Sequence, residues 1–250
     1  DCVLSLPSKI SLKDQDLIKA VQTCLALAVS RQADHLNTGC SWNPTGEKMQ
    51  HLYARQAVPM VWDFCESNVF GLSVGNWSST VDCCLSGLSA ARFRASPGTA
   101  DQTPAQAQSL PDDSANALVT DPPYYDAVPY GYLSDFFYVW LRRCLLASHD
   151  SFFTDTAVPK QQEIVVDRPH ELSKSTHDIA FYEHELTKAF AECRRVLRPD
   201  GVGTIVFASK TTASWEAIIK ALVDAGWIIT GSWPIDTELE TRIAAAGQAR

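Results

Sequence analysis

The segment ALVTDPPYYDAVPYG, residues 117–131, combines residue types that could bind a planar amine. Its apolar start predicts a strand that ends at Asp121, and ligands of open α/β sheets bind where strands end. Pro122 and Pro123 have a fixed φ and no N–H, so this stiff backbone presents its carbonyls as hydrogen-bond acceptors. Tyr124 adds a flat aromatic face beside those acceptors. The pattern favours a substrate that is planar and carries an NH₂ group.

An aromatic amine is a weak nucleophile, because its lone pair is delocalised into the ring. Acceptors on its two N–H bonds would favour a pyramidal nitrogen and make the lone pair available to an electrophile placed in line. The Tyr124 ring would hold the substrate by stacking, which is worth about 1–3 kcal/mol per base. A base in a duplex would first have to be flipped out. The chemistry expected is group transfer to an exocyclic amine, and it requires no metal.

Strands and helices alternate around this motif. Strands are predicted at residues 117–120, 203–208 and 227–233, and helices at 133–147, 178–197 and 212–226. Alternation of this kind indicates a parallel, doubly wound α/β sheet. Leu118–Thr120, Thr204–Ala208 and Ile228–Thr230 are therefore expected as parallel neighbours, with Asp121 and Lys210 at the same edge. The turn RPDG is expected to end the second of these helices, with Gly201 as its cap.

The chain is expected to divide into three parts. Residues 1–94 form a mainly helical section, with helices predicted over 11–31 and 49–70. Residues 95–116 are rich in Ala, Ser, Pro, Asp and Gln, which indicates a flexible linker or surface loop. Residues 117–250 hold the alternating strands and helices, and thus the motif itself.

Composition sets limits on function. The formal net charge of −8 argues against a surface that binds nucleic acid throughout, although it leaves room for a local basic patch. The eight cysteines form no C-x-x-C pair, which favours reduced thiols over a zinc site or a disulfide framework. Neither an apolar run long enough for a membrane span nor a signal peptide is evident, so a cytoplasmic protein is expected.

The string TDPPYYD resembles the catalytic motif of methyltransferases that use S-adenosylmethionine to methylate adenine N6 or cytosine N4. The longer string TDPPYYDAVPYGYLSDFFYVWLRR is more specific. Together with ARQAVPMVWDF, AFAECRRVLRPDGVGTIVFASKTTASWEAII and GSWPIDTE, it is similar to a family of large prokaryotic adenine-specific DNA methylases, some with a zinc ribbon. The likeness covers roughly residues 12–94 and 117–245.

The resemblance implies a role for each residue of the motif. Asp121 and the Pro122 carbonyl would accept hydrogen bonds from the target amine, and Asp121 would also border the cofactor, S-adenosylmethionine. Pro123 would stiffen the loop, and Tyr124 would stack on the base. The fold implied is a partial Rossmann-like methyltransferase domain, with DNA as the partner.

Three further residues are candidate nucleic-acid contacts: Tyr125, Lys210 and Arg55. Tyr125 matches the family string but is also compatible with a place in the core. Lys210 lies past a predicted strand end, where a solvated lysine is the plainer reading. Arg55 lies in the string ARQAVPMVWDF, whose aromatic residues are of a type usually found in cores.

The chain also departs from the family pattern. The glycine-rich cofactor loop is missing, because GLSVGNW and RPDGVGT lack the strand–loop–helix context that such a loop needs. No zinc ribbon is present. The chain therefore looks like the catalytic-motif half of a methyltransferase, and an N-terminal portion of the same enzyme is expected to be needed for cofactor binding.

Two alternatives stay open. The first keeps the chemistry and changes the acceptor to cytosine N4, an RNA base or a protein amide, because the motif alone does not separate one exocyclic amine from another. The second is a non-catalytic module that keeps the fold and binds nucleic acid or a partner. The missing glycine-rich loop favours the second alternative, whereas the intact motif argues against it.

Overall fold

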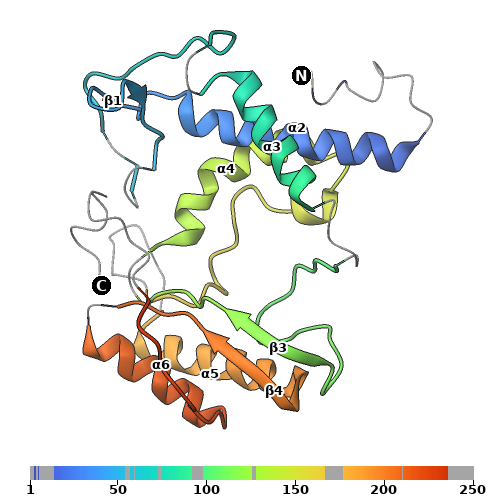
Figure 1. Ribbon diagram of the computed structural model, residues 1–250, viewed down its shortest axis with the longest axis vertical. Coiled ribbons are helices and arrows are strands. Elements are labelled where there is room, and N and C mark those ends of the chain that lie inside the picture. The colour runs from blue at the N-terminus through green and yellow to red at the C-terminus, as the bar shows by residue number, and fades with distance from the viewer. Residues whose placement is uncertain are drawn as a thin grey trace. The chain divides into compact units, whose positions relative to one another are not determined.

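The computed structural model describes residues 3, 5, 14–53, 57–58, 60–72, 75–91, 98–125, 128–166, 177–209 and 211–235. The chain forms two compact units (Figure 1). The first is Asp1–Gly98 with Tyr130–Lys160, and the second is Thr99–Pro129 with Gln161–Arg250. This division differs from the expected boundaries at residues 94 and 117, because residues 130–160 belong with the N-terminal helices.

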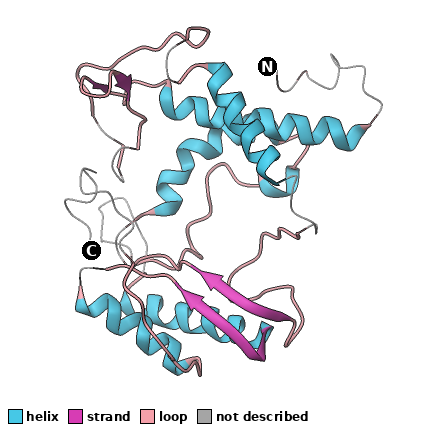
Figure 2. Ribbon diagram, in the orientation of Figure 1, coloured by secondary structure: helices cyan, strands magenta, loops and turns pink. Residues whose placement is uncertain are grey.

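The first unit is mainly helical (Figure 2). Its elements are α2 (Gln15–His35), β1 (Trp42–Asn43), β2 (Lys48–Met49), α3 (Trp77–Ala91), α4 (Tyr130–Leu145) and the 3₁₀ helix η1 (Asp150–Phe152). Helix α2 begins at Gln15, inside the predicted range 11–31, because the Asp14 side chain accepts hydrogen bonds from the Asp16 and Leu17 N–H groups. Its centre packs against α4, with Ala26, Leu145 and Phe153 buried in one cluster.

The helix predicted over 49–70 was wrong for the part of it that the structure describes. Residues 50–53, 57–58 and 60–70 contain no helix. The backbone of this segment forms hydrogen bonds with residues distant along the chain instead of within a helix. The Leu52 N–H donates to the Asp34 carbonyl at 2.9 Å, and the Cys65 N–H donates to the Cys40 carbonyl at 3.2 Å. Trp62, expected in a core, is 92% exposed.

No helix in the described ranges is long and apolar enough to cross a membrane.

The second unit is a small parallel α/β layer. Its elements are β3 (Ala115–Thr120), α5 (Ile179–Val196), β4 (Leu197–Ile205) and α6 (Thr212–Asp224). Strands β3 and β4 are parallel, and Leu118, Val119 and Thr120 lie opposite Gly203, Thr204 and Ile205. The two helices pack together beside the sheet (Figure 1). The buried cluster contains Tyr182, Leu186 and Phe190 of α5 together with Ile218 and Leu222 of α6, and Ile205, Phe207 and Trp227 pack against it.

The helices of the second unit have clear end signals. The Asp178 side chain caps α5 by accepting from the Phe181 N–H at 2.8 Å. The cap of α6 is Thr211, one residue before the predicted start, and it accepts from the Ser214 N–H. Gly226 follows α6 with φ +81°, the left-handed backbone that ends many helices and suits glycine.

The sheet differs from the sequence expectation in three ways. The strands are not buried on both faces, since Val119 is 74% and Val202 66% exposed. Residues 228–230 form no strand, and Ile228 is 84% exposed. The turn RPDG lies within β4 as a register irregularity between the Ala115–Leu197 and Ala117–Val202 pairs, so Gly201 is not a helix cap. The fold shown is thus mixed α/β, with one parallel strand pair in the described part of this unit.

Candidate functional site

Residues Asp121–Tyr124, here called the acceptor edge, directly follow β3. The ladder extends to the last residue of β3, since the Val206 N–H donates to the Thr120 carbonyl at 2.9 Å. Asp121 is exposed, Pro122 is buried, and the two residues after them are half-buried. Because β3 and β4 are parallel, the acceptor edge and residues 206–209 lie at the same end of the sheet, as expected for a ligand site in such sheets.

An aromatic row of Tyr124, Phe207 and Trp215 extends from this edge. The Tyr124 and Phe207 rings meet edge to face, with centroids 5.4 Å apart and planes at 71°. Phe207 meets Trp215 of α6 in the same way, at 5.0 Å and 89°. Edge-to-face pairs of this kind add about 0.5–1.5 kcal/mol beyond burial. The row therefore fixes the Tyr124 ring through Phe207, which follows β4, and through Trp215 of α6.

The far end of the acceptor edge is tied to α5 and to the segment before it. The hydroxyl of Tyr182, a fully buried residue, donates to the Pro123 carbonyl at 2.9 Å. The Tyr125 ring packs edge to face on Tyr182 at 5.3 Å, and the Tyr125 carbonyl accepts from the Val166 N–H at 2.9 Å. Tyr125 is thus partly a core residue, and its contact with nucleic acid stays a prediction.

Tyr182 lies in the helix predicted over 178–197, but the sequence analysis missed its hydrogen bond. A signal was available, because a buried tyrosine usually finds a partner for its hydroxyl. The sequence did not say which of many carbonyls that partner would be. Pro123 lies 59 positions away along the chain.

The two proline carbonyls have different surroundings. The Pro123 carbonyl already accepts from Tyr182. Among the described residues, no hydrogen bond reaches the Pro122 carbonyl. The Asp121 carboxylate is exposed beside it. The edge therefore holds an exposed carboxylate and, in the buried Pro122, a carbonyl with no hydrogen bond among the described residues, next to a half-buried tyrosine ring. Two acceptors are what the N–H bonds of one amine can use.

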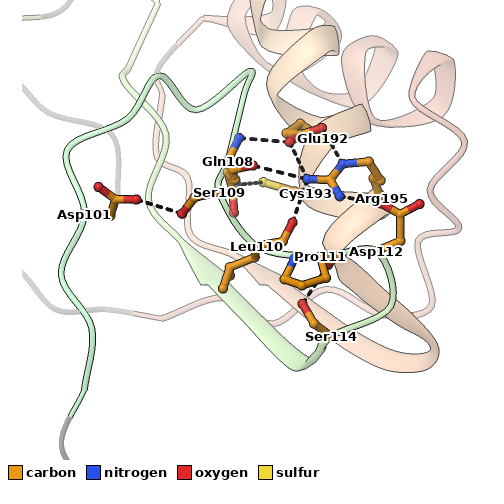
Figure 3. A network of polar contacts seen from close by, with 10 residues as sticks. All are labelled: Asp101, Gln108, Ser109, Leu110, Pro111, Asp112, Ser114, Glu192, Cys193 and Arg195. Atoms are coloured by element: carbon orange, nitrogen blue, oxygen red, sulfur yellow. Dashed lines mark hydrogen bonds and ion pairs between the residues drawn. The ribbon is translucent and has the colours of Figure 1, made fainter.

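A network of polar contacts fixes the start of β3 (Figure 3). Arg195 of α5 contacts the Asp112 carboxylate and donates to the Leu110 carbonyl at 2.9 Å and to Glu192 Oε1 at 2.7 Å. The Gln108 N–H also donates to Glu192 Oε1, at 2.8 Å. The described part of the expected linker, residues 98–114, is thus a surface loop held on α5.

Three acid–base groups of this network have a shifted pKa, and the pKa of Arg195 is raised by its hydrogen bonds to Glu192 and Asp112. The hydrogen bond from Arg195 lowers the pKa of Glu192 to about 2, against its partial desolvation. Burial raises the pKa of the Cys193 thiol, which accepts a hydrogen bond from the Gln108 amide at 3.5 Å. Next to the network, the Asp113 and Ser114 N–H groups donate to the Arg195 and Val196 carbonyls at 3.0 and 2.9 Å. The network thus fixes the start of β3, and this in turn sets the position of Asp121, which follows the end of the strand.

The two other candidate nucleic-acid contacts, Lys210 and Arg55, fall on parts of the chain that the structure does not describe. In the described ranges, no three His, Cys, Asp or Glu side chains converge in a way that could hold a metal ion. A cradle for S-adenosylmethionine is not found there either, because Gly201 and Gly203 lie inside β4 and not in a loop between a strand and a helix.

Comparison of the chain with protein-family models, with curated proteins and with solved structures finds no match.

Proposed function

We propose that this chain carries the acceptor site of an S-adenosylmethionine-dependent methyltransferase that acts on the N6 amine of adenine in DNA. One observation carries the proposal: Asp121 and Pro122 follow a strand of a parallel pair at its carboxyl end, and directly precede Pro123 and Tyr124, the first residue of the aromatic row. The likeness of TDPPYYD to the motif of amino-methyltransferases supports the assignment of the reaction.

The acceptor edge would act on the amine. The Asp121 carboxylate and the Pro122 carbonyl would each accept one N–H of the flipped adenine, which draws the lone pair out of conjugation with the ring. Hydrogen bonds that strengthen as the nitrogen becomes pyramidal stabilise the transition state more than the bound substrate, and this is the condition for a faster chemical step. S-adenosylmethionine would supply the methyl group as an electrophile and would leave as S-adenosylhomocysteine, and the methylated nitrogen would lose one proton to the Asp121 carboxylate or to solvent. The described residues include no cradle for the cofactor, so no step is assigned to its binding.

The aromatic row would hold the base. A base that leaves the duplex loses its stacking partners, and an aromatic side chain replaces part of that interaction. Tyr124 is the member of the row nearest to Asp121 along the chain, and its ring is held by Phe207, 5.4 Å away. A ring fixed in this way orients the base at little cost in side-chain entropy.

A second candidate function is a non-catalytic module that binds nucleic acid. It is favoured by one observation, which is that the described part of the chain contains no glycine-rich loop between a strand and a helix. The two functions differ in whether any methyl group is transferred. Cytosine N4, an RNA base and a protein amide remain alternative acceptors within the first function.

The full reading frame that encodes this chain provides the test. We would incubate the purified protein and radiolabelled S-adenosylmethionine with fragmented genomic DNA from a host without base methylation, and in parallel with RNA and with a protein extract. The proposal expects label in DNA, and the variant Asp121→Ala serves as the control for a contaminating enzyme. Label in RNA or protein alone would change the acceptor, and binding of DNA without transfer would favour the non-catalytic module.

A further inference from the structure

We propose that Tyr182 is a positioning residue of the acceptor edge. Its hydroxyl holds the Pro123 carbonyl and so sets the backbone rotation at which Asp121 and the Pro122 carbonyl receive one amine. The catalytic consequence rests on the proposed function, whereas the positioning rests on the geometry of this unit alone.

A pair of prolines does not by itself fix where its carbonyls point. The ring sets φ, and the following Pro123 confines Pro122 to an extended ψ, but the ψ of Pro123 itself is free to take extended or helical values. In an extended proline segment with three residues per turn, one carbonyl is rotated about 120° from the next. Fixing the Pro123 carbonyl therefore holds the end of the segment on which the Pro122 carbonyl lies. The edge needs a restraint on ψ, and the prolines do not supply it.

Tyr182 is suited to provide this restraint. Its side chain is 0% exposed and lies within the core of the second unit. Water cannot replace a hydrogen bond in such a place, so breaking it costs more than breaking the same bond at the surface. The ring is also held by its edge-to-face contact with Tyr125. A rigid donor thus meets a carbonyl that would otherwise rotate with the loop.

Two backbone hydrogen bonds complete the restraint. On the strand side, the Val206 N–H holds the Thr120 carbonyl, and on the far side the Val166 N–H holds the Tyr125 carbonyl, each at 2.9 Å. The Tyr182 bond lies between them, inside the acceptor edge. The two prolines thus have separate tasks: the Pro123 carbonyl anchors the segment, and the Pro122 carbonyl is left for the substrate.

The variant Tyr182→Phe tests the proposal, because it removes the hydroxyl and keeps the ring. We would measure amide exchange by NMR in the 250-residue chain, and single-turnover methylation of DNA by the full reading frame. The matched control is Tyr138→Phe, whose hydroxyl donates to the Asp155 carbonyl at 2.8 Å in the first unit. In Tyr182→Phe the Val166 amide should exchange about tenfold faster, the size of one lost hydrogen bond. The Trp227 amide, bonded to Leu222 at 3.0 Å, should not change.

The methylation rate constant of Tyr182→Phe should also fall about tenfold with an unchanged KM for DNA, as expected when only the transition state loses an interaction. Tyr138→Phe should alter neither readout. The proposal would be overturned if the exchange rate of the Val166 amide did not change. It would also be overturned if the Val166 and Trp227 amides exchanged faster by the same factor, because the whole core would then have loosened. A raised KM with an unchanged rate constant would also overturn it. If the unaltered protein transfers no methyl group, the proposed function fails, while the exchange result still decides whether Tyr182 positions the edge.

Discussion

Asp121 is the residue on which the proposed chemistry depends most. It is exposed at the end of β3, where its carboxylate can reach a substrate without disturbing the core. We expect Asp121→Ala to lower the single-turnover methylation rate by about 100- to 1,000-fold, the usual cost of removing one positioned transition-state partner. The matched control is Asp200→Ala, which removes another exposed carboxylate from the same unit. Equal rates in the two variants would show that the acceptor edge is only a structural turn.

Tyr124 should act through its ring and not through its hydroxyl. Stacking needs the aromatic face, so Tyr124→Phe is expected to keep the methylation rate within about threefold, whereas Tyr124→Ala should lose about 10- to 100-fold. Titration with adenine-containing duplex would show whether the loss lies in base binding or in the rate constant. Equal damage in both variants would mean that the hydroxyl has a chemical role.

At the scale of elements, the network on α5 determines where β3 starts. Glu192 has a folded-state pKa of about 2, below the ordinary value of about 4.3 for an unfolded chain. A carboxyl group whose pKa is lower in the folded than in the unfolded state stabilises the fold. This contribution is complete at a pH above the pKa of the unfolded state, and it is lost as the pH falls toward the pKa of the folded state. The attachment of the loop should therefore weaken between about pH 4.3 and pH 2.

The protection of the Ser114 amide, which donates to the Val196 carbonyl, reports on this attachment. Glu192→Gln should lower the protection of the Ser114 amide against hydrogen exchange about tenfold at neutral pH, as for one lost hydrogen bond. The variant should also remove most of the loss of protection that acidification causes in the unaltered protein. Glu216→Gln, at an exposed position of α6, is the control and should leave the pH profile unchanged. A full acid response in Glu192→Gln would assign the pH dependence to another group.

The elements show which features a sequence can predict. The helix expected over 178–197 is observed as Ile179–Val196, because its buried residues recur every three or four positions and Asp178 caps it locally. The predicted strand at 228–230 failed, because a strand exists only where another segment pairs with it. The helix over 49–70 failed for a related reason, since its Leu52 N–H bonds to Asp34 of α2. Local patterns are readable in the sequence, whereas partners distant along the chain are not.

The same limit applies to the site. The motif placed Asp121 at the end of a parallel strand, because a buried run, an acid and two prolines are all local features. The contacts that hold the motif, from Tyr182 and Phe207, come from residues far along the chain. Their types were visible, but their partners follow only from packing.

For the whole molecule, the expectation concerns S-adenosylmethionine, because the sequence lacks the glycine-rich loop that usually binds it. The described residues provide acceptors and an aromatic row but no cradle for S-adenosylmethionine. We therefore expect the 250-residue chain to give no saturable heat with micromolar S-adenosylmethionine in calorimetry. Tight binding by this chain alone would show that residues outside the described ranges, or a cradle of another kind, hold the cofactor.

The most direct test of the central claim is to identify the methylated base. The full reading frame would be expressed in a bacterial host that lacks base methylation, and the host DNA would be digested to nucleosides and measured by mass spectrometry. Genomic DNA contains every short recognition sequence, so the assay does not require the site to be known. The account predicts N6-methyldeoxyadenosine with the unaltered protein and with Asp200→Ala, and its loss with Asp121→Ala. N4-methyldeoxycytidine in its place, or N6-methyldeoxyadenosine that persists in Asp121→Ala, would contradict it.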